Sequence, residues 1–244
     1  MSHLALLEVD RIEKSFGGLR AVDGLTFGVS SGEILGLIGP NGSGKTTALN
    51  LISGALKPTG GSVRLGGHEI AGRPAHEIAH FGITRTFQLV RCLQSLTAME
   101  NIIAGLAFGP NQLWGTEAHA RAELLLELVG LGGRGAEMPS RMTYIDQKRI
   151  ELGRALARDP KVLLLDEFLA GLNPTELQLG VDLISELRNE GRTIILVEHV
   201  MEAIRSLCDH CVAMNAGAKI AEGTPDDVLG HPEVIQAYLG ESDA

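Results

Sequence analysis

The sequence predicts an α/β fold in which a parallel sheet carries a phosphate-binding loop, and two observations support that prediction. The first is the segment GPNGSGKT at residues 39–46, which fits the pattern G-x-x-x-x-G-K-[ST] at every fixed position. It lies between an apolar run at 34–38 and a helix-compatible run at 46–51, which gives the order strand, loop, helix. The second is a pair of further apolar runs of strand length, each followed directly by an acidic residue.

The phosphate-binding loop suits a triphosphate, because many donors must converge on one small volume. Gly39, Gly42 and Gly44 leave room for the backbone to approach the phosphates. The loop N–H groups and the positive end of the following helix then face the β-phosphate. Lys45 reaches the β and γ oxygens as a compact cation, and Thr46 offers its hydroxyl to Mg²⁺. A glycine-rich turn made for packing alone is the alternative, and the Gly-Lys-Thr ending disfavours it.

The composition indicates a soluble chain with an acidic balance. Its 244 residues suit one α/β domain or one domain with a smaller lobe. The apolar runs are far shorter than the roughly 20 residues that cross a bilayer. No charged and apolar leader opens the chain, so we expect a cytoplasmic protein. The net charge of −9 argues against nucleic acid as a partner, because proteins that bind nucleic acid present a basic face.

The three cysteines fit a reducing compartment, because they are few and odd in number. Cys208 and Cys211 form a C-x-x-C pair, but the sequence has no second pair to complete a zinc site. Cys211 also opens an apolar run, so we expect both to be buried thiols.

The segments before the loop predict short strands at 6–12 and 25–29, with another at 62–65. Their close spacing predicts an antiparallel patch that leads into the nucleotide loop. Phe16 follows the first of them, and an exposed aromatic ring there would stack on an adenine. Ordinary packing of Phe16 explains the pattern equally well.

The segment KVLLLDE at 161–167 places two acids at the end of an unbroken apolar run. Such a run is typical of a central parallel strand covered on both faces. Asp166 is then placed to hold the Mg²⁺ shell opposite Thr46, and Glu167 to polarise a water. Acids at a strand end are often solvated turn residues, but the upstream loop favours the catalytic interpretation.

The apolar run at 193–197 repeats this design and ends in Glu198 and His199. A neutral imidazole of His199 would contact the γ-phosphate or the attacking water, although a lone histidine is more often a surface or core residue. Because open α/β sheets bind ligands at the carboxyl ends of their strands, we favour the functional role.

About 120 residues separate Lys45 from Asp166, which is far more than one crossover helix requires. We therefore predict a small helical lobe at 89–158, inserted into a core made of residues 1–88 and 159–244.

Within the lobe, Thr97 and Glu100 are spaced as a capping box that opens a helix. Residues 117–128 are rich in Ala, Leu and Glu, with apolar residues at helical spacing. The stretches at 105–115 and 130–139 are predicted to be loops.

The chain contains five motifs whose types and order resemble those of the ATP-binding cassette (ABC) family, and the resemblance covers nearly the whole chain. They are Walker A at 39–46, the Q-loop at 86–88, Walker B at 162–167, the D-loop at 170–173 and the H-switch at His199. The resemblance implies one nucleotide-binding domain, residues 1–244. Its fold would be an α/β P-loop NTPase (RecA-like) core with an N-terminal antiparallel β subdomain and an inserted α-helical subdomain.

Four segments are similar to the ATPase subunits of branched-chain amino acid and amide importers. They are residues 82–88, 170–174, 197–199 and 231–240. The resemblance implies an ATPase that uses ATP and Mg²⁺ at the cytoplasmic face of the inner or plasma membrane. It also implies a second ABC ATPase subunit, in a hetero- or homodimer, two membrane permeases and, indirectly, a periplasmic or extracellular solute-binding protein.

The resemblance also assigns roles to individual residues. The catalytic residues would be Lys45, Gln88, Glu167 and His199, and the metal ligands Thr46, Gln88 and Asp166. Gln88 would also sense the permease. The ATP-binding residues would be Phe16, Gly39, Pro40, Asn41, Gly42, Ser43, Gly44, Lys45, Thr46, Thr47, Gln88 and His199. Phe168 departs from the proline usual in the family.

The signature segment, which covers the nucleotide of the partner subunit, departs further from the family pattern. It consists of Thr143, Tyr144, Ile145, Asp146 and Gln147. Ile145 replaces a glycine and Asp146 a glutamine, so we expect a restricted approach and a repulsive charge near the triphosphate. Thr143 and Asp146 also fit a capping box that starts a helix. The expectation is an asymmetric heterodimer in which the site on Lys45 and Glu167 hydrolyses ATP and the opposite site is slow.

Three other functions remain open. A lipid or lipopolysaccharide exporter ATPase shares this compact layout. A soluble ABC protein of translation or DNA maintenance would show tandem cassettes, coiled coils or a basic surface, and none is present. A P-loop kinase would leave the D-loop and H-switch matches without an explanation.

Overall fold

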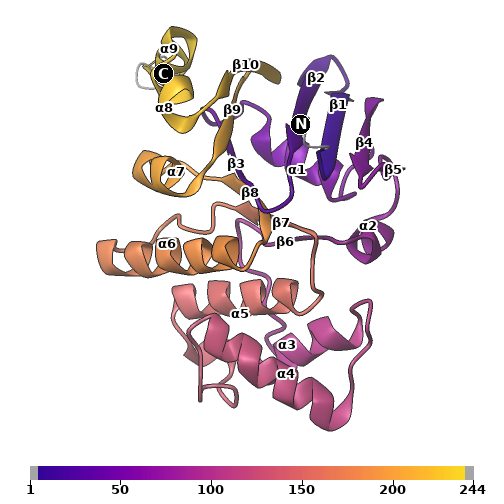
Figure 1. The fold of residues 1–244 in the computed structure, drawn as a ribbon, viewed down its shortest axis with the longest axis vertical. Helices are drawn as coiled ribbons and strands as arrows, with labels where there is room; N and C mark the ends of the chain where they lie inside the picture. The colour runs from indigo at the N-terminus through magenta and orange to yellow at the C-terminus, as the bar shows by residue number, and fades with distance from the viewer. Residues whose placement is uncertain (1–4, 240–244) are drawn as a thin grey trace.

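The computed structural model describes residues 5–239, which form two β-sheets with helices between and around them (Figure 1). The smaller sheet has four antiparallel strands in the order β2-β1-β4-β5. They are β1 (Leu7–Phe16), β2 (Leu19–Val29), β4 (Gly60–Leu65) and β5 (His68–Glu69). The predicted antiparallel patch is therefore confirmed. Its first two strands are longer than predicted, because β1 and β2 continue as one hairpin up to Phe16 and Leu19.

The larger sheet has six strands in the order β10-β9-β3-β8-β7-β6. They are β3 (Ile34–Ile38), β6 (Ile83–Arg85), β7 (Val162–Asp166), β8 (Thr193–Val197), β9 (His210–Asn215) and β10 (Ala218–Gly223). All neighbours pair in parallel except β10, which runs antiparallel to β9. The three apolar runs of the sequence are thus the adjacent central strands β3, β8 and β7, each buried at every residue. Their carboxyl ends meet at one edge of the sheet.

The helices form groups that can be followed in Figure 1, where α3, α4 and α5 lie together at the end far from the antiparallel sheet. The helices are α1 (Lys45–Ile52), α2 (Ala75–Phe81), α3 (Ala98–Ala107), α4 (Gly115–Leu128), α5 (Tyr144–Leu156), α6 (Pro174–Asn189), α7 (Met201–Leu207), α8 (Pro225–Leu229) and α9 (Pro232–Leu239), with a 3₁₀ turn at Pro139–Arg141. No described helix is long and apolar enough to cross a bilayer.

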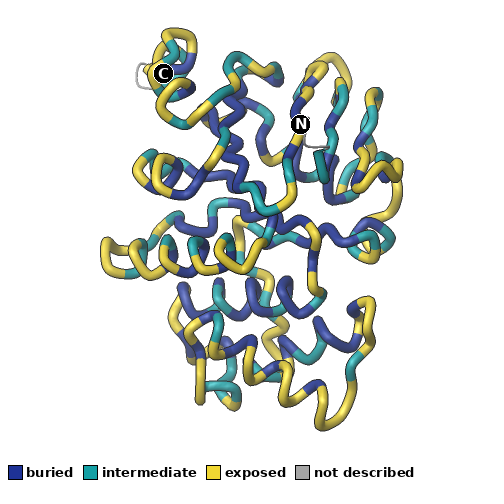
Figure 2. The backbone as a smooth tube through the Cα atoms, in the orientation of Figure 1, coloured by how far each residue is buried: buried dark blue, intermediate teal, exposed yellow. Residues whose placement is uncertain are grey.

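Two hydrophobic clusters lie on the two faces of the larger sheet. Figure 2 shows buried residues concentrated along the strands in the middle of the molecule. Val162 and Leu164 join the cluster with α1 and the antiparallel strands, whereas Leu163 and Leu165 join the one with α3 to α7. Alternate residues of one strand therefore enter opposite cores, as a doubly covered parallel strand requires. Because α3, α4 and α5 share a cluster with the sheet, the division at residues 89–158 stays a prediction.

Local helix signals in the lobe are confirmed, with one correction. The Thr97 hydroxyl accepts from the Glu100 N–H at 3.2 Å, and the Glu100 carboxylate accepts from the Thr97 N–H at 2.8 Å, which completes the predicted capping box. The predicted loop at 105–115 was wrong at both ends, because α3 continues through Ala107 and α4 begins at Gly115. Gly105 lies inside the helix, where it lets α3 approach α5: a Cβ there would be 2.6 Å from the Arg154 carbonyl oxygen.

The two C-x-x-C thiols are buried and free, as predicted. They lie against β3, since a Cβ on Gly36 would be 2.9 Å from the Cys211 sulfur and 3.0 Å from that of Cys208.

The close approach of α3 and α5 at Gly105 leads us to expect that a larger residue there lowers the stability of the fold. Gly105→Ala should lower the free energy of unfolding by about 1–3 kcal/mol, because the new methyl overlaps the Arg154 carbonyl, although alanine favours the helix by about 1 kcal/mol. Urea unfolding followed by circular dichroism measures it. The matched control is Gly18→Ala, where a Cβ meets nothing within 4 Å and the change should stay within about 0.5 kcal/mol. Equal effects of the two substitutions would contradict the packing role of Gly105.

Candidate functional site

The phosphate-binding loop is held in shape by its own chain. At Gly39, φ is 146°, and a Cβ would lie 2.1 Å from the Met214 carbonyl oxygen, so only glycine fits where β3 ends. The buried Lys45 ammonium donates to the carbonyl oxygens of Gly39 at 2.7 Å and Pro40 at 2.8 Å. By contrast, a Cβ on Gly42 would meet nothing within 4 Å. Contacts with the rest of the protein therefore fix the loop at Gly39 and Lys45. At Gly42 the loop is open, which leaves space for a phosphate to approach.

A cavity of about 490 Å³ opens beside this loop. It is lined by Asn41, Gly42, Gly44, Lys45, Thr46 and Thr47 of the loop and α1, and by Gln88 and Glu167. Its remaining lining comes from Leu19, Arg20 and Ala21 of β2 and from Ala216 and Gly217 between β9 and β10, none of which the sequence pattern indicated. Ala216 and Gly217 are more than 150 positions from the loop along the chain, and the β2 residues belong to the other sheet. No local spacing in the sequence therefore identifies them.

Three predicted catalytic residues meet at Glu167, directly after β7. One oxygen of its carboxylate accepts from the Gln88 side-chain amide at 2.7 Å, and the other lies 3.1 Å from the His199 Nε2. Gln88 follows β6 and His199 follows β8, so the parallel strands deliver all three to one edge. Glu167 also has a left-handed backbone, with φ at 52°, which is a strained conformation for a residue with a side chain.

Asp166 is buried at the last position of β7 and forms an ion pair with Arg85, whose Nη2 lies 3.0 Å from Oδ2. The same guanidinium donates to the Asn50 side chain at 2.6 Å and the Ser53 hydroxyl at 3.2 Å, so it joins β6, β7 and the end of α1. Burial raises the pKa of Asp166, and the Arg85 charge opposes that shift. Burial also lowers the pKa of Arg85, which Asp166 opposes. Sequence reasoning missed Arg85, since nothing local separates it from a surface arginine.

The oxygen-rich side of this cavity fits Mg²⁺. Asp166 Oδ1 is buried and has no hydrogen-bond partner among the described residues. Thr46 and Gln88 line the cavity beside the phosphate-binding loop, and Asp166 lies behind that lining, directly before the lining residue Glu167. Carboxylate, hydroxyl and amide oxygens are the ligands that Mg²⁺ prefers, and a buried carboxylate oxygen without a partner is otherwise costly. The donor set is therefore suited to a hydrated magnesium ion.

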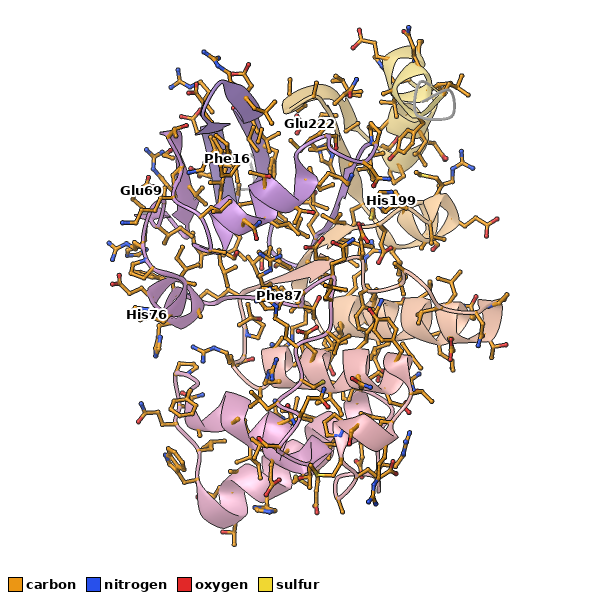
Figure 3. All side chains as sticks on the ribbon, turned by 180° about the vertical axis from the view of Figure 1, so that it is seen from behind. Phe16, Glu69, His76, Phe87, His199 and Glu222 are labelled. Atoms are coloured by element: carbon orange, nitrogen blue, oxygen red, sulfur yellow. The ribbon has the colours of Figure 1, made fainter. Side chains whose placement is uncertain are left out.

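Phe16 is placed differently from the loop residues. It lies at the end of β1, half-exposed, with the Lys14 ammonium 5.2 Å from its ring centroid. Figure 3 shows it on the antiparallel sheet, away from His199. Its partner across the hairpin, Leu19, lines the cavity, but Phe16 does not. Its stacking on adenine stays a prediction.

The signature segment begins α5, with Thr143 as the N-cap and its hydroxyl accepting from the Asp146 N–H at 3.3 Å. The Ile145 and Asp146 side chains are buried in their own chain, and Asp146 pairs with Arg134 at 3.0 Å. Burial acts to raise the pKa of Asp146, but hydrogen bonds from Thr143 and Arg134 outweigh it and lower the pKa. This corrects the physical reason given for an altered signature, since neither side chain projects outward. The exposed residues are Thr143 and Tyr144.

The next residues of α5 attach the signature helix to the end of β7. Gln147 is half-buried, and its side-chain amide donates to the Met142 carbonyl at 3.3 Å. The buried Lys148 ammonium donates to the backbone carbonyls of Glu167 at 3.0 Å, Phe168 at 2.9 Å and Ala170 at 2.8 Å. Phe168, which replaces the usual proline, is buried in the core. Lys148 was also missed by sequence reasoning, because its three acceptors are distant backbone groups.

Glu198, directly before His199, is fully buried. One carboxylate oxygen accepts from the Leu169 N–H at 2.6 Å, and the other has no hydrogen-bond partner among the described residues. Burial raises the pKa of Glu198 to about 7, against the bond from Leu169 and the charge of Lys148. The carboxyl therefore changes charge near neutral pH.

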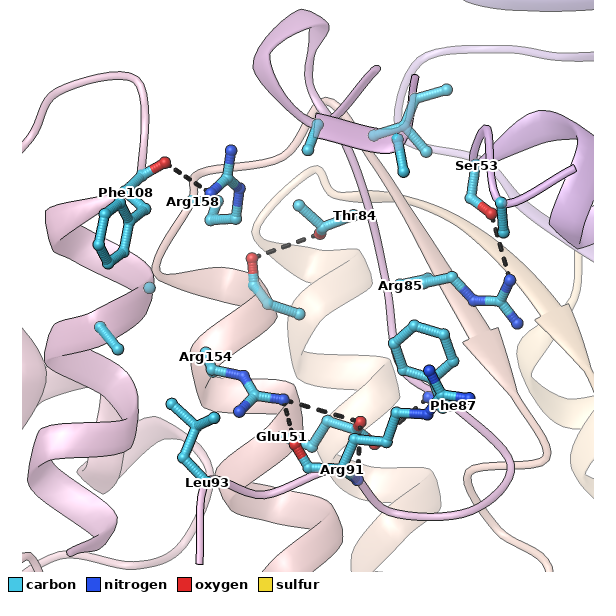
Figure 4. Close-up of a pocket in the computed structure, with 17 residues that line it drawn as sticks. Ser53, Thr84, Arg85, Phe87, Arg91, Leu93, Phe108, Glu151, Arg154 and Arg158 are labelled. Atoms are coloured by element: carbon cyan, nitrogen blue, oxygen red, sulfur yellow. Dashed lines mark hydrogen bonds and ion pairs between the residues drawn. The ribbon is translucent and has the colours of Figure 1, made fainter. Parts of the chain in front are cut away.

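A second cavity of about 530 Å³ lies between β6, α3 and α5 (Figure 4). Phe87, Phe108 and Leu93 give it an apolar lining, with Arg91, Arg154 and Arg158 among them. The Glu151 carboxylate, from α5, accepts from the N–H groups of Phe87 at 3.3 Å and Arg91 at 3.2 Å. The segment that carries Gln88 is thereby tied to this second cavity.

The raised pKa of Glu198 predicts how stability depends on pH. The folded carboxyl holds its proton up to about pH 7 and the unfolded one only to about pH 4.5, so stability falls as pH rises through this window. Relative to the wild type, Glu198→Gln should gain about 2 kcal/mol in unfolding free energy between pH 5 and pH 8. Urea titrations at both pH values measure this. The exposed Glu123→Gln is the control, and parallel curves for Glu198→Gln and wild type would contradict the assignment.

Comparisons with known proteins agree with this geometry. Residues 22–170 match the family model described as ABC transporter, and residues 218–244 match that of the branched-chain amino acid ATP-binding cassette transporter. Of the latter range, 240–244 lie outside the described residues, as does Gly240 of the similar segment 231–240. The high-affinity branched-chain amino acid transport ATP-binding protein BraF of Pseudomonas aeruginosa is 41% identical, over 97% of this chain and 98% of that protein. The corresponding LivG protein of Escherichia coli K12 is 39% identical over the same shares.

Solved structures show the same fold. The ADP conformation of MJ1267, an ATP-binding cassette of an ABC transporter, has a TM-score of 0.88 at 31% identity, covering 97% of this chain and 99% of that one. The dimeric ATP-binding cassette MJ0796, bound to ADP and Pi after hydrolysis, has a TM-score of 0.81 at 26% identity, covering 90% and 98%. The predicted fold, a P-loop core with an antiparallel sheet and added helices, is confirmed. The chain therefore belongs to the ABC transporter family, and it is similar over nearly its whole length to the family's branched-chain amino acid transport ATP-binding proteins.

Proposed function

We propose that this chain is the ATP-hydrolysing subunit of an importer for branched-chain or related amino acids. One observation carries the proposal: Gln88, Glu167 and His199 converge beside the cavity of the phosphate-binding loop, at the carboxyl ends of parallel strands. The names of the relatives support the substrate class, and the same comparisons disfavour the lipid exporter and the soluble ABC protein.

In the proposed reaction, the loop N–H groups and Lys45 bind the β- and γ-phosphates, and the chain supplies the remaining groups around the γ-phosphate. Thr46, Gln88 and Asp166 Oδ1 would hold Mg²⁺, which supplies charge neutralisation of the phosphate oxygens. Glu167 accepts the proton of the attacking water, and His199 contacts the γ-phosphate.

The bonds at Glu167 indicate a resting arrangement. Both of its carboxylate oxygens are engaged, one by Gln88 and one by His199. Gln88 and His199 are also the proposed contacts of the metal and the γ-phosphate, so each would have to leave Glu167 to reach them, whereas each carboxylate oxygen keeps a second lone pair for a proton. We infer that nucleotide binding exchanges these partners, which couples the arrival of the γ-phosphate to the freeing of the base.

We also propose that a second ABC ATPase subunit completes the nucleotide site, in an asymmetric heterodimer. The support is the altered signature, in which the exposed part of the helix start is Thr143 and the bulky ring of Tyr144. Since Ile145 and Asp146 are turned inward, the asymmetry would come from the loss of the glycine that Ile145 replaces, not from a repulsive carboxylate.

Two membrane permeases are the proposed partners at the second cavity, with a solute-binding protein feeding them and this chain at the cytoplasmic face of the membrane. The support is the apolar lining around Phe87 and Phe108 and the connection to Gln88 through Glu151. A permease helix seated there would sense the segment that contacts Glu167.

A base-removing variant tests the reaction. In the assembled complex, Glu167→Gln should lower phosphate release by about 10²- to 10⁴-fold with ATP binding retained, because only the proton acceptor is lost. Glu190→Gln, at an exposed residue that ends α6, is the control and should retain full turnover.

The same variant tests the asymmetry. The equivalent substitution in the partner ATPase should lower turnover far less than Glu167→Gln. Equal losses from the two substitutions would contradict the asymmetric heterodimer, whereas full turnover by Glu167→Gln would contradict the catalytic role.

The second cavity makes a separate prediction. Phe108→Ala should weaken the complex with the permeases by roughly tenfold, because an exposed aromatic anchor is lost, and should leave ATP binding by the isolated chain unchanged. Co-purification of the permeases in detergent measures it. Trp114→Ala removes an equally exposed aromatic outside the cavity lining and should not weaken the complex. If both variants retain the permeases fully, they dock elsewhere.

A further inference from the structure

The C-terminal helix makes a direct contact with the phosphate-binding loop. The backbone N–H of Gly39 donates to the hydroxyl oxygen of Tyr238, in α9, at 2.8 Å. The two residues are 199 positions apart, so only the tertiary fold joins them. The Tyr238 ring packs against the core cluster on the α3 to α7 face of the larger sheet. Helix α9 thus presents a fixed oxygen at the first residue of the loop.

Gly39 is a point where the backbone needs an acceptor. Its neighbour Ile38 is the last residue of β3 paired with β9, so the sheet ladder stops before the Gly39 N–H. A buried N–H without a partner is costly, and the Tyr238 hydroxyl supplies that partner. The carbonyl of the same residue accepts from the Lys45 ammonium at 2.7 Å. Gly39 is therefore held at its N–H by α9 and at its carbonyl by the catalytic lysine.

Holding both groups matters because glycine is conformationally free. Without a side chain, Gly39 rotates about φ and ψ more readily than other residues, and its φ of 146° is outside their usual range. The Tyr238 bond holds the peptide before Gly39 and the Lys45 bond holds the carbonyl after it, so the two contacts together limit rotation about φ and ψ of Gly39. A small rotation here moves the ammonium relative to the phosphates.

We propose that Tyr238 is a positioning residue of the nucleotide site, which acts through Gly39 on Lys45. The proposal rests on the proposed ATPase function. It gives the C-terminal segment, which carries its own family match, a role in shaping the loop that lies in the other half of the chain. Tyr238 does not line the cavity beside the loop, so it would act on the nucleotide only through the loop backbone.

Tyr238→Phe tests the proposal, because it removes only the hydroxyl. The dissociation constant for a fluorescent Mg²⁺–ATP analogue, and the KM for ATP, should rise about three- to tenfold, the range expected for one lost hydrogen bond. The kcat at saturating ATP should change little, whereas the melting temperature should fall by about 2–4 °C, because the Gly39 N–H loses its acceptor. Gln236→Ala, at an exposed side chain of the same helix, is the control and should bind as the wild type does.

A second readout is independent of nucleotide. Hydrogen exchange of the Gly39 amide, followed by NMR on the nucleotide-free chain, should be faster in Tyr238→Phe and unchanged in Gln236→Ala. Tyr238→Leu separates packing from hydrogen bonding, since it removes both. If Phe behaves as the wild type while Leu weakens binding, the ring and not the hydroxyl matters, and the proposal is overturned.

Failure of the two proposals can be told apart. If the wild type neither binds nor hydrolyses ATP but Gly39 exchange still responds to Tyr238→Phe, the proposed function falls and the contact stands. If the wild type hydrolyses ATP and neither affinity nor Gly39 exchange responds, the role of Tyr238 falls alone.

Discussion

Both faces of a parallel sheet are buried, so polar side chains are costly within its strands. The carboxyl ends of the strands are the main positions where such side chains are accommodated. In this chain, β3, β7 and β8 are apolar at almost every buried position, and each is followed at the same edge, within two residues, by a residue of the site. Gly39, Glu167 and His199 are those residues. The phosphate-binding loop, the Glu167 carboxylate and the His199 imidazole lie together because the strands that carry them are neighbours in the sheet.

Several charged side chains are buried directly behind the residues that line the cavity, and each needs a nearby partner. Arg85 pairs with Asp166, and Lys148 binds three backbone carbonyls beside Glu198. Burying such groups is costly unless partners are close, and removing one partner leaves the other uncompensated. Two carboxylate oxygens, on Asp166 and Glu198, still have no hydrogen-bond partner among the described residues. The pKa values of both carboxyls are raised by burial, and groups with shifted pKa values cluster at functional sites.

The signature segment illustrates how side-chain direction changes a chemical argument. From the residue types alone, Asp146 adds a negative charge near a triphosphate. In the fold, its carboxylate is buried against Arg134, and Ile145 is buried beside it, so the surface offered to a partner is formed by other residues. Residue type was known, but the rotation of the helix start about its axis depends on packing against the loop that carries Arg134.

Much of this chain could be inferred from short-range patterns. The strand before the phosphate loop, the helix after it, the buried strand ending in Asp166 and the capping box at Thr97 each depend on residues within a few positions, so spacing and side-chain type were sufficient. The tertiary structure alone decided the placement of Arg85, Lys148 and Tyr238, and the inward direction of Asp146. Arg85 and Tyr238 find their partners 81 and 199 positions away. Hydrogen bonds over such separations follow from how sheets and helices pack, because no local periodicity records which distant backbone group a side chain will meet.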